Sequence, residues 1–324
     1  MKGYLSGLLA AGTLVFCFVV FAQPGYAETW PQRTVRITTP FAPGISPDVA
    51  ARTLADALAK RWNQAVIVEN RPGGDTMVGT RAFFNSGDDH GLLFTTHSTF
   101  TVIPLLYAKV PYDPVRDMSP ITLAVEDYLT IAAAPSLEVS SLPGFVKLAR
   151  DNPTKLNFYA APGSPYLAYL AFQKRAGIAT TYVAYNSPVS AIADLSEGRI
   201  HIAVMPLASV LGTAQTGKVK LLAVTNTERT PIAPNVPTVT EAGYPEFAFG
   251  GLLGLFGRKD MPAELRERIA SDVIIVLKDP DVRERLTKVG LTPRGTTPTQ
   301  FTTILDGQRL KWAAIAHEHN IEPQ

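Results

Sequence analysis

The chain has 324 residues and a formal net charge of +2 at neutral pH, and 46% of its residues are hydrophobic. So small a net charge excludes a strong global field that would draw nucleic acid or an acidic membrane surface to the protein. The length suits one large domain or two smaller ones.

The first 27 residues have the features of a secretory signal peptide. A short positive start precedes Tyr4 to Phe21, which are almost wholly apolar or small. Gly25 and Ala27 place small residues at the two positions that a signal peptidase recognises. We therefore predict export to the periplasm and cleavage before Glu28. A retained membrane anchor is the alternative interpretation of the apolar run.

The single cysteine, Cys17, lies inside this predicted leader. Phe16 precedes it, where a bacterial lipoprotein signal needs a small residue, so lipid anchoring is not expected. The mature chain would contain no cysteine, which excludes disulfides and cysteine-based catalysis or metal binding. Loss of Lys2, the one charged residue of the leader, lowers the formal charge from +2 to about +1.

Strand-like and helix-like runs then alternate along the chain. The predicted strands are Val35–Thr39, Ala65–Glu69, Leu92–Thr95, Leu129–Ala133, Leu156–Tyr159, Thr181–Tyr185, Ile200–Met205, Leu221–Thr225 and Phe249–Phe256. The predicted helices are Pro47–Trp62, Met77–Asn85, Phe145–Asp151, Tyr166–Ala176, Ser187–Glu197, Ala263–Lys278, Pro280–Val289 and Pro298–His319. This alternation predicts an α/β fold with mainly parallel sheets, in which ligands bind beyond the carboxyl ends of the strands.

The first strand and helix make the most informative unit. After Val35–Thr39 and a Pro/Gly turn, Ser46 suits the cap of a helix, Pro47 its first position and Asp48 its positive first turn. The unpaired backbone N–H groups of such a helix start favour an anion.

A similar helix start recurs more than a hundred residues later. Gly163-Ser164-Pro165 repeats the form of Ile45-Ser46-Pro47, and each follows a strand and a Gly/Pro turn. Two similar halves facing one cleft would bring both helix starts against a shared ligand. The alternative is that Ser-Pro is simply a common way to begin a helix.

A series of short motifs covers nearly the whole mature chain. They are Trp30-Pro31, Phe41-Ala42-Pro43-Gly44, Val68-Glu69-Asn70-Arg71-Pro72-Gly73, Pro111-Tyr112-Asp113-Pro114-Val115-Arg116-Asp117, Pro237-Thr238-Val239, Glu241-Ala242-Gly243, Asp279-Pro280 and Val282-Arg283. In this order and at these spacings the chain resembles the periplasmic solute receptors of tripartite tricarboxylate transporters, often called the Bug family.

The resemblance implies an α/β fold of the periplasmic binding protein kind, a type II-like clamshell of two lobes joined by two crossing strands. By analogy the crossings fall near Asp127–Pro135 and Phe249–Arg258. We therefore expect residues 1–27 as the signal peptide, 28–126 plus 250–324 as the first lobe and 127–249 as the second lobe.

The binding loops depart from the family pattern. Ile45 stands where the family has a second glycine, and Asp75 and Thr76 stand where further glycines usually follow. Tyr166 replaces a histidine, and Met205 replaces an aspartate. Asp75 either caps the next helix, which we favour, or faces the ligand.

The predicted ligand-binding residues lie at the turns that follow the strands. They are Phe41, Pro43, Gly44, Ile45, Ser46, Asp75, Thr76, His97, Ser98, Gly163, Ser164, Tyr166, Tyr185 and Met205.

Each prominent member of this set has a plainer alternative. Ser46 and Ser164 would otherwise only cap helices, and His97 would be a solvated loop residue. Tyr166 and Tyr185 would pack between elements, and Met205 would belong to the core.

No catalytic or cofactor motif is found. The sequence contains no Gly-x-Ser-x-Gly elbow, Walker loop or dinucleotide glycine fingerprint. His317-Glu318-His319 lacks a third ligand at suitable spacing, so we expect no metal and no cofactor. The chain is therefore predicted not to be an enzyme.

The leading functional hypothesis is a monomeric periplasmic receptor. It would bind a small organic carboxylate, with an apolar or aromatic body, and deliver it to the subunits of a membrane transporter. The alternative is a periplasmic ligand sensor that docks on a signalling protein, because both roles need the same clamshell.

Overall fold

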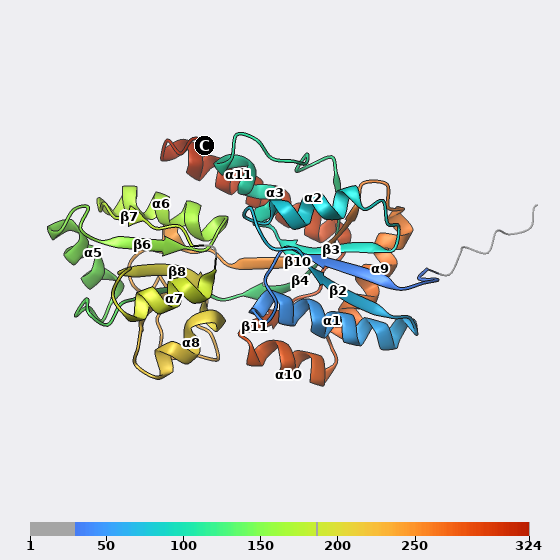
Figure 1. Cartoon of the computed structure of the whole chain (residues 1–324), viewed down its shortest axis with the longest axis horizontal. Helices are drawn as coiled ribbons and strands as arrows, with labels where there is room; N and C mark the ends of the chain where they lie inside the picture. Colours follow the sequence, from blue (N-terminus) through green and yellow to red (C-terminus); the bar gives the residue numbers. More distant parts are fainter. Residues whose placement is uncertain (1–29, 186, 324) are drawn as a thin grey trace, which may run out of the picture. The chain divides into compact units, whose positions relative to one another are not determined.

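The computed structural model describes residues 30–185 and 187–323. The predicted signal peptide, its cleavage site and Cys17 lie outside these residues. Residues 31–324 form one compact unit with two separate β-sheets, each flanked by helices (Figure 1). We call each sheet with its helices a lobe, and the arrangement confirms the predicted two-lobed α/β fold.

The first lobe is built on a six-stranded sheet with the order β11-β4-β10-β3-β1-β2. Its strands are β1 (Val35–Thr39), β2 (Val66–Asn70), β3 (Gly91–Thr96), β4 (Met118–Asp127), β10 (Gly251–Arg258) and β11 (Leu291–Pro293). Its helices are α1 (Ser46–Trp62), α2 (Met77–Asn85), α3 (Ser98–Thr101), α4 (Ile103–Leu106), α9 (Ala263–Val276) and α10 (Pro280–Lys288).

The second lobe is built on a five-stranded sheet with the order β7-β6-β8-β5-β9. Its strands are β5 (Leu129–Ala133), β6 (Asn157–Ala160), β7 (Thr181–Tyr182), β8 (Ile202–Pro206) and β9 (Lys220–Val224). Its helices are α5 (Leu142–Asp151), α6 (Ser164–Ala176), α7 (Pro188–Ser196), α8 (Leu207–Gln215) and the short 3₁₀ helix η1 (Pro245–Phe247).

The final helix, α11 (Pro298–Glu318), contributes to both lobes. A capping box of Thr297 and Gln300 fixes its start. Phe301 packs in an aromatic cluster of the first lobe, whereas Trp312 packs in the main core of the second lobe. The lobe boundaries drawn from the sequence stay a prediction, but this helix is a third link between the lobes. No helix of the described residues is long and apolar enough to span a membrane.

The sheets are mixed, so the expectation of mainly parallel sheets is wrong. The pairs β1–β2, β1–β3, β6–β7 and β6–β8 are parallel. By contrast, β5 is antiparallel to β8 and β9, and β10 is antiparallel to β3 and β4. β5 and β10 each enter their sheet from the other lobe, so they run away from the junction while their neighbours run toward it.

Most predicted elements are found within two or three residues of their expected ends, but several were missed. The missed elements are β4, β11, α3, α4, α8 and η1. β4 is buried on both faces and contains Pro120, so it shows neither clean alternation nor a continuous apolar run. α8 begins directly after β8 without a side-chain cap, which hides the boundary between them.

Side-chain alternation divides the core of the second lobe into two layers. Along β8, Ile202 and Val204 belong to the layer with α5 and α6, whereas Ala203 and Met205 belong to the layer with α7 and α8. This period of two follows from the pleat of a strand and fixes which side of the sheet Met205 faces.

Asn226, which is 3% exposed, ties the crossing strands together at the junction of the lobes. Its side-chain oxygen accepts from the Leu129 N–H at 3.1 Å. Its Nδ2 donates to the Asp127 carbonyl at 3.2 Å and to Glu126 Oε1 at 3.1 Å. One amide therefore binds the chain on both sides of Tyr128, where the chain leaves the first sheet for the second.

Replacing Asn226 tests this clamp. We expect Asn226→Ala to lower the free energy of unfolding by about 1–3 kcal/mol, because buried backbone groups lose their partners. Urea denaturation measures the change. Asn85→Ala, at the exposed end of α2, is the matched control and should change stability by less than about 0.5 kcal/mol. Equal stability of the two variants would contradict the clamp.

Candidate binding cavity

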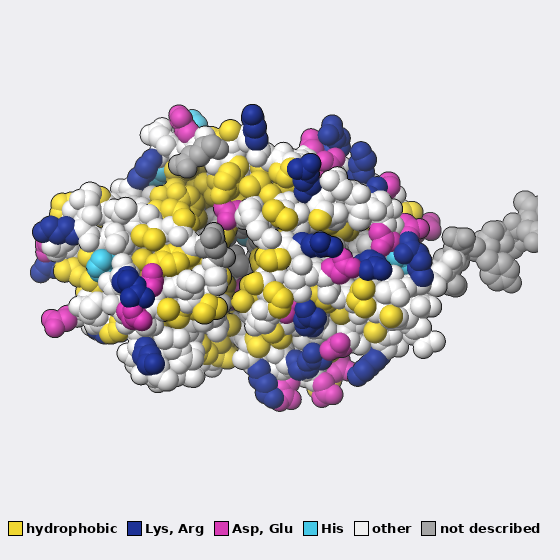
Figure 2. Space-filling model, viewed as in Figure 1, with side chains coloured by type: hydrophobic (Ala, Val, Ile, Leu, Met, Phe, Trp, Pro, Cys, Tyr) yellow, Lys and Arg dark blue, Asp and Glu magenta, His cyan; other side chains and the backbone are white. Residues whose placement is uncertain are grey.

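A cavity of about 500 Å³ lies where the carboxyl ends of β1, β2, β3, β6 and β8 face the junction of the lobes. Figure 2 shows a hollow in the middle of the molecular surface that faces the viewer, with many hydrophobic side chains around it. Residues of both predicted helix starts, Ile45 and Pro47 of the first and Ser164 and Pro165 of the second, line this one cavity. The expectation that the two starts share a cleft is thus confirmed.

The structure brings eight of the predicted ligand-binding residues to the cavity wall. They are Phe41, Ile45, Asp75, Thr76, Ser98, Ser164, Tyr185 and Met205. The six predicted residues that do not line it are Pro43, Gly44, Ser46, His97, Gly163 and Tyr166.

Neither serine caps its helix, so the capping role assigned to Ser46 and Ser164 is wrong. Both are the first helical residues, and the cap positions are Ile45 and Gly163, which make no side-chain capping bond. Of the described side-chain groups, the Ser46 hydroxyl is among the buried ones that have no hydrogen-bond partner. A hydroxyl one position inside the helix does not reach the N–H groups that a cap residue binds.

The start of α1 is instead held by the buried carboxylate of Asp48. Its Oδ2 accepts from the Gly44 N–H at 2.8 Å and from Arg52 at 3.0 Å, and its Oδ1 accepts from Asn70 at 2.7 Å. Asn70 also donates to the Phe41 carbonyl at 3.0 Å. This network joins the Phe41–Gly44 turn to the end of β2, and it compensates part of the positive end of α1 within the protein.

Hydrogen bonding determines the charge state of Asp48. Burial by itself would raise its pKa, but the hydrogen bonds from Arg52, Asn70 and Gly44 outweigh burial and hold the pKa below the usual value. Asp48 is therefore an ionised group at neutral pH, although its side chain is only 2% exposed.

Ser98 of the first lobe supplies the acceptor that the start of α6 lacks. Its hydroxyl accepts from the Ser164 N–H at 3.2 Å and donates to the Ser164 hydroxyl at 3.1 Å. Gly163 permits this approach, because a Cβ at that position would lie 2.7 Å from the Ser98 Cβ and its φ is +84°. The contact between lobes thus forms beside the cavity at a helix N-terminus.

Asp75 lines the cavity and does not cap α2, so the favoured prediction of a cap is wrong. The cap position is Thr76, which makes no side-chain capping bond. The Asp75 carboxylate accepts a hydrogen bond from the Tyr107 hydroxyl. Burial and the neighbouring Asp75 charge raise the pKa of Tyr107, which keeps this hydroxyl a donor.

Aromatic and apolar side chains form the wall on the second lobe. Tyr185 lines the cavity, meets Tyr159 edge-on with ring centroids 5.7 Å apart, and donates its hydroxyl hydrogen to Asp194. Met205 is fully buried beside them. Tyr166 stacks on Phe158, with ring centroids 6.4 Å apart, and is not a lining residue.

His97 is fully buried, so the alternative of a solvated loop residue is wrong. Its Nδ1 lies 3.0 Å from the Thr101 hydroxyl, and its backbone N–H donates to the Leu252 carbonyl at 2.8 Å. Burial, together with the charge of Lys311, lowers the pKa of His97 to about 3, so the ring is neutral.

Sequence reasoning missed Asp127, which ends β4 and lines the cavity. Its position at the end of a buried strand is the signal that points to it, but β4 itself was not predicted. Among the described lining residues there is no Lys, Arg or His, and the acidic side chains are Asp75 and Asp127. Polarity in this cavity therefore comes from backbone dipoles, hydroxyls and two carboxyl groups.

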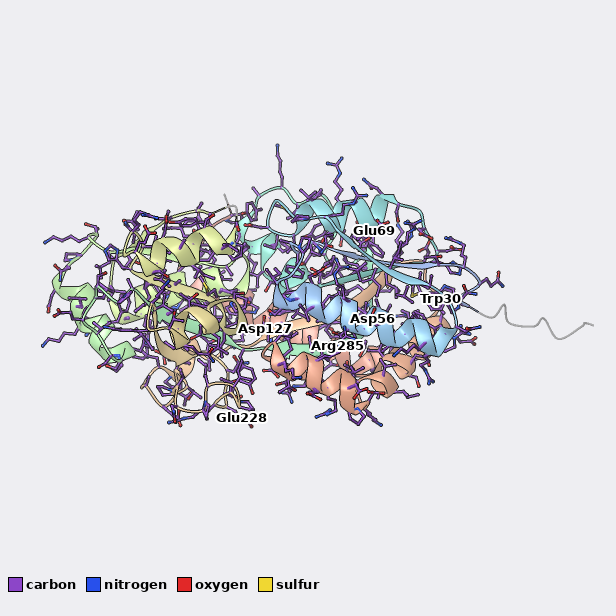
Figure 3. The ribbon with its side chains drawn as sticks, turned by 60° about the horizontal axis from the view of Figure 1, so that its bottom comes forward. Trp30, Asp56, Glu69, Asp127, Glu228 and Arg285 are labelled. Carbon is purple, nitrogen blue, oxygen red and sulfur yellow. The ribbon has the colours of Figure 1, made fainter. Side chains whose placement is uncertain are left out.

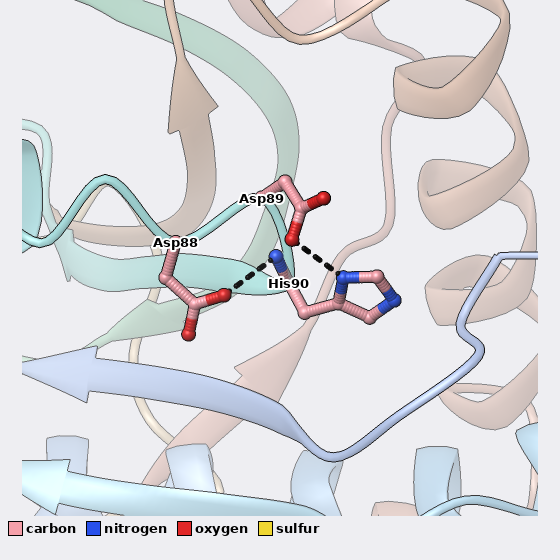
Figure 4. A group of neighbouring side chains, drawn as sticks. All are labelled: Asp88, Asp89 and His90. Atoms are coloured by element: carbon pink, nitrogen blue, oxygen red, sulfur yellow. Dashed lines mark hydrogen bonds and ion pairs between the residues drawn. The ribbon is translucent and has the colours of Figure 1, made fainter.

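Asp88, Asp89 and His90 form a cluster away from this cavity (Figure 4). Potential ligand atoms of the three residues lie within 4.8 Å of one another. The His90 N–H donates to Asp88 at 3.0 Å, and Arg33 pairs with both aspartates. These contacts explain the cluster as a charged turn before β3.

Comparisons with known proteins point to one family. Residues 50–321 match the family described as the tripartite tricarboxylate transporter family receptor. The chain is 28% identical over 318 residues to the protein BugT of Bordetella pertussis. This alignment covers 97% of this chain and 98% of BugT.

Two solved structures share the fold closely. An R. palustris protein solved with adipate is 25% identical, with a TM-score of 0.85 over 91% of this chain and 100% of that protein. MatC from Rhodopseudomonas palustris with bound malate is 26% identical, with a TM-score of 0.80 over 88% of this chain and 99% of MatC.

The lowered pKa of Asp48 predicts a pH-dependent contribution to stability. The folded state binds fewer protons at this site than the unfolded chain, so the contribution is complete above the unfolded pKa of about 3.9. It is lost as the pH falls through the lower folded pKa. We expect the wild type to be more stable than Asp48→Asn at neutral pH and the difference to shrink on acidification.

Urea denaturation of both proteins between about pH 6 and pH 3 measures this difference. Asp151→Asn, at the exposed end of α5, is the control for a carboxylate outside the network. A difference between wild type and Asp48→Asn that stays constant over the whole range would contradict the assignment.

Proposed function

We propose that this chain, which belongs to the tripartite tricarboxylate transporter receptor family, captures a small organic carboxylate between its two lobes and delivers it to a membrane transporter. Its family consists of substrate-binding receptors, and the chain is a binding protein rather than an enzyme. The observation that carries the proposal is the single cavity lined by helix starts from both lobes.

The start of α6 is the stronger site for the ligand carboxylate. α1 carries Asp48 in its first turn, whereas α6 has no acidic residue there. The positive end of α6 is therefore less compensated, and the Ser98 and Ser164 hydroxyls lie beside it. A carboxylate at this point would receive hydrogen bonds from groups of both lobes.

Contacts to both lobes would link binding to closure. A ligand shifts the open and closed populations only through its different affinity for the two states. Because groups from both lobes meet at Ser98 and Ser164, a ligand bound there has more partners when the lobes are closed. The closed form is the one we propose the transporter recognises.

The body of the ligand would lie against an apolar wall. Ile45, Tyr185 and Met205 line the cavity, and we propose that they favour an alkyl or aromatic body. The related structures with adipate and malate support small carboxylic acids as the ligand class. We propose that α-amino acids bind less well, because an ammonium group would lose its hydration against this wall and the Asp75 carboxylate is already engaged by the Tyr107 hydroxyl.

A direct binding assay tests the ligand class. We expect adipate, malate, benzoate or hexanoate to raise the melting temperature and to release or absorb heat in calorimetry, because only the folded state binds them. Aspartate and glutamate should bind more weakly than the acids without an ammonium group. Tight binding of amino acids, with no response to the other acids, would contradict the proposed preference.

Two serine variants separate a ligand contact from a structural role. Ser164→Ala should weaken carboxylate affinity by about 10- to 100-fold, the effect of losing a hydrogen bond to a charged group. Ser141→Ala removes the cap of α5, whose side chain accepts from the Gly144 N–H. It should lower stability by about 1 kcal/mol without changing the affinity.

We propose that the mature protein is periplasmic and begins at Glu28. The leader residues support this proposal, because small residues stand where the peptidase cleaves. N-terminal sequencing of the protein from a periplasmic extract should read Glu28-Thr29-Trp30. Recovery of the uncleaved chain in the membrane fraction would contradict it and favour a retained anchor.

A further inference from the structure

The carboxyl group of Asp127 is a feature that the proposed carboxylate site does not use. Asp127 ends β4 and lines the cavity beside Leu129 and Gly251. Figure 3 shows it at the junction of the two lobes. It therefore lies where the ligand and the crossing strands meet.

Asp127 is buried, and one of its two carboxyl oxygens lacks a hydrogen-bond partner. The residue is 3% exposed, and its Oδ1 is among the buried described atoms without a hydrogen-bond partner. A buried carboxyl oxygen without a partner is costly in either protonation state. An unpartnered carboxyl oxygen on a residue that lines a cavity is best explained by a hydrogen-bond partner that arrives with the ligand.

Gly251 gives the side chain its room. It pairs with Asp127 across β4 and β10, and a Cβ at Gly251 would lie 3.0 Å from the Asp127 Cβ. A contact at that distance would force one of the two residues to shift. The glycine therefore allows the carboxyl group to sit at the cavity wall.

The charged groups around Asp127 do not supply a counter-ion. On β4, the adjacent Glu126 is already paired with Arg294, which follows β11. Asn226 binds the Asp127 carbonyl rather than its side chain. The backbone N–H of the next residue, Tyr128, donates to the Asp127 carboxyl group and favours its charged form, but it carries no charge.

The other ionisable groups that line the cavity are acidic or phenolic. They are Asp75, Tyr159 and Tyr185. β10 contributes Gly251 and Leu253 to the wall, and β11 presents Leu291 opposite Asp127. Burial raises the pKa of Asp127 well above its usual value, and the Glu126 charge raises it further.

We propose that the Asp127 carboxyl group contacts the ligand directly and donates a hydrogen bond to an oxygen atom of the bound carboxylic acid. This inference rests on the proposed function, because it takes a carboxylate as the ligand. Two like charges in a cavity without a basic side chain repel strongly, and one proton shared between them removes the repulsion. Below the pKa of Asp127 in the free protein the proton is already in place, whereas above that pKa the ligand anion binds together with a proton taken from solvent.

This arrangement defines the ligand class more narrowly. One carboxylate binds at the start of α6, and a second oxygen group, such as a carboxylate, hydroxyl or carbonyl, accepts from Asp127. Dicarboxylic and hydroxycarboxylic acids meet both requirements, whereas a simple monocarboxylate meets only the first. Asp127 then acts as a specificity-determining residue for the second oxygen group.

Calorimetry of adipate binding at several pH values tests the inference. For the wild type we expect affinity to fall, by up to about tenfold per pH unit, once the pH exceeds the pKa of Asp127 in the free protein. Above that pKa, titrations in buffers of different ionisation enthalpy should reveal proton uptake on binding. This readout uses the unaltered protein, so it does not depend on whether a variant folds.

Two substitutions of Asp127 give opposite expectations. Asp127→Asn keeps a donor at the same place, so adipate affinity should stay within a few-fold of wild type while the pH dependence and proton uptake disappear. Asp127→Leu removes the donor and should weaken adipate binding by about 10- to 100-fold. Glu228→Gln, at an exposed carboxylate on the loop after β9, should leave the affinity and the proton uptake unchanged.

The outcomes separate this inference from the proposed function. If the wild type binds adipate with neither proton uptake nor a loss of affinity at any pH up to the limit of its stability, or if Asp127→Asn takes up as many protons as wild type, the role of Asp127 is wrong and the carboxylate receptor stands. Adipate affinity that rises with pH over the range in which adipate is fully ionised would also overturn the inference, because the ionised form of Asp127 would then bind the ligand better. If neither adipate nor any other carboxylate binds the wild type, the proposed function itself fails.

Discussion

The antiparallel pairing of β4 with β10 is the constraint on which the rest of this structure depends. The chain leaves the first sheet at the end of β4 and returns to it at the start of β10, so both ends of the second lobe are anchored at one place. Asn226 and Thr225 reinforce that place with hydrogen bonds to Leu129 and Phe249. Because the crossing strands begin and end there, the junction also becomes one wall of the cavity.

The cavity presents polar groups without basic side chains among its described lining residues, and this follows from how its walls are made. Turns after parallel strands present helix starts and small residues, so their positive potential comes from backbone N–H groups. At α1 the Asp48 carboxylate neutralises part of this positive potential. At the start of α6 the nearby group is the neutral hydroxyl of Ser98. The two lobes are therefore similar in architecture but unequal in electrostatics.

Local sequence patterns predicted most of the elements and eight of the lining residues. Strands such as Val35–Thr39 and Leu129–Ala133 were predicted with the bounds that the structure gives, because their apolar runs are bounded by turn residues. Turn positions such as Phe41, Thr76 and Ser164 follow from the rule that ligands bind at strand ends. β4 was not predicted, because burial on both faces, together with Pro120, removes the alternation of apolar and polar residues that marks a strand.

The sequence by itself determined the α/β class, the alternation of elements, the repeated helix starts and the resemblance to a receptor family, because these depend on neighbours along the chain. Tertiary structure alone decided that Asp48 holds the first turn, that Ser98 serves the helix start of the opposite lobe and that Asp127 is buried opposite Gly251. In each case the deciding partner comes from another element, often from the other lobe. The ionisation and hydrogen bonding of a side chain depend on such partners and on burial, and a linear pattern specifies neither.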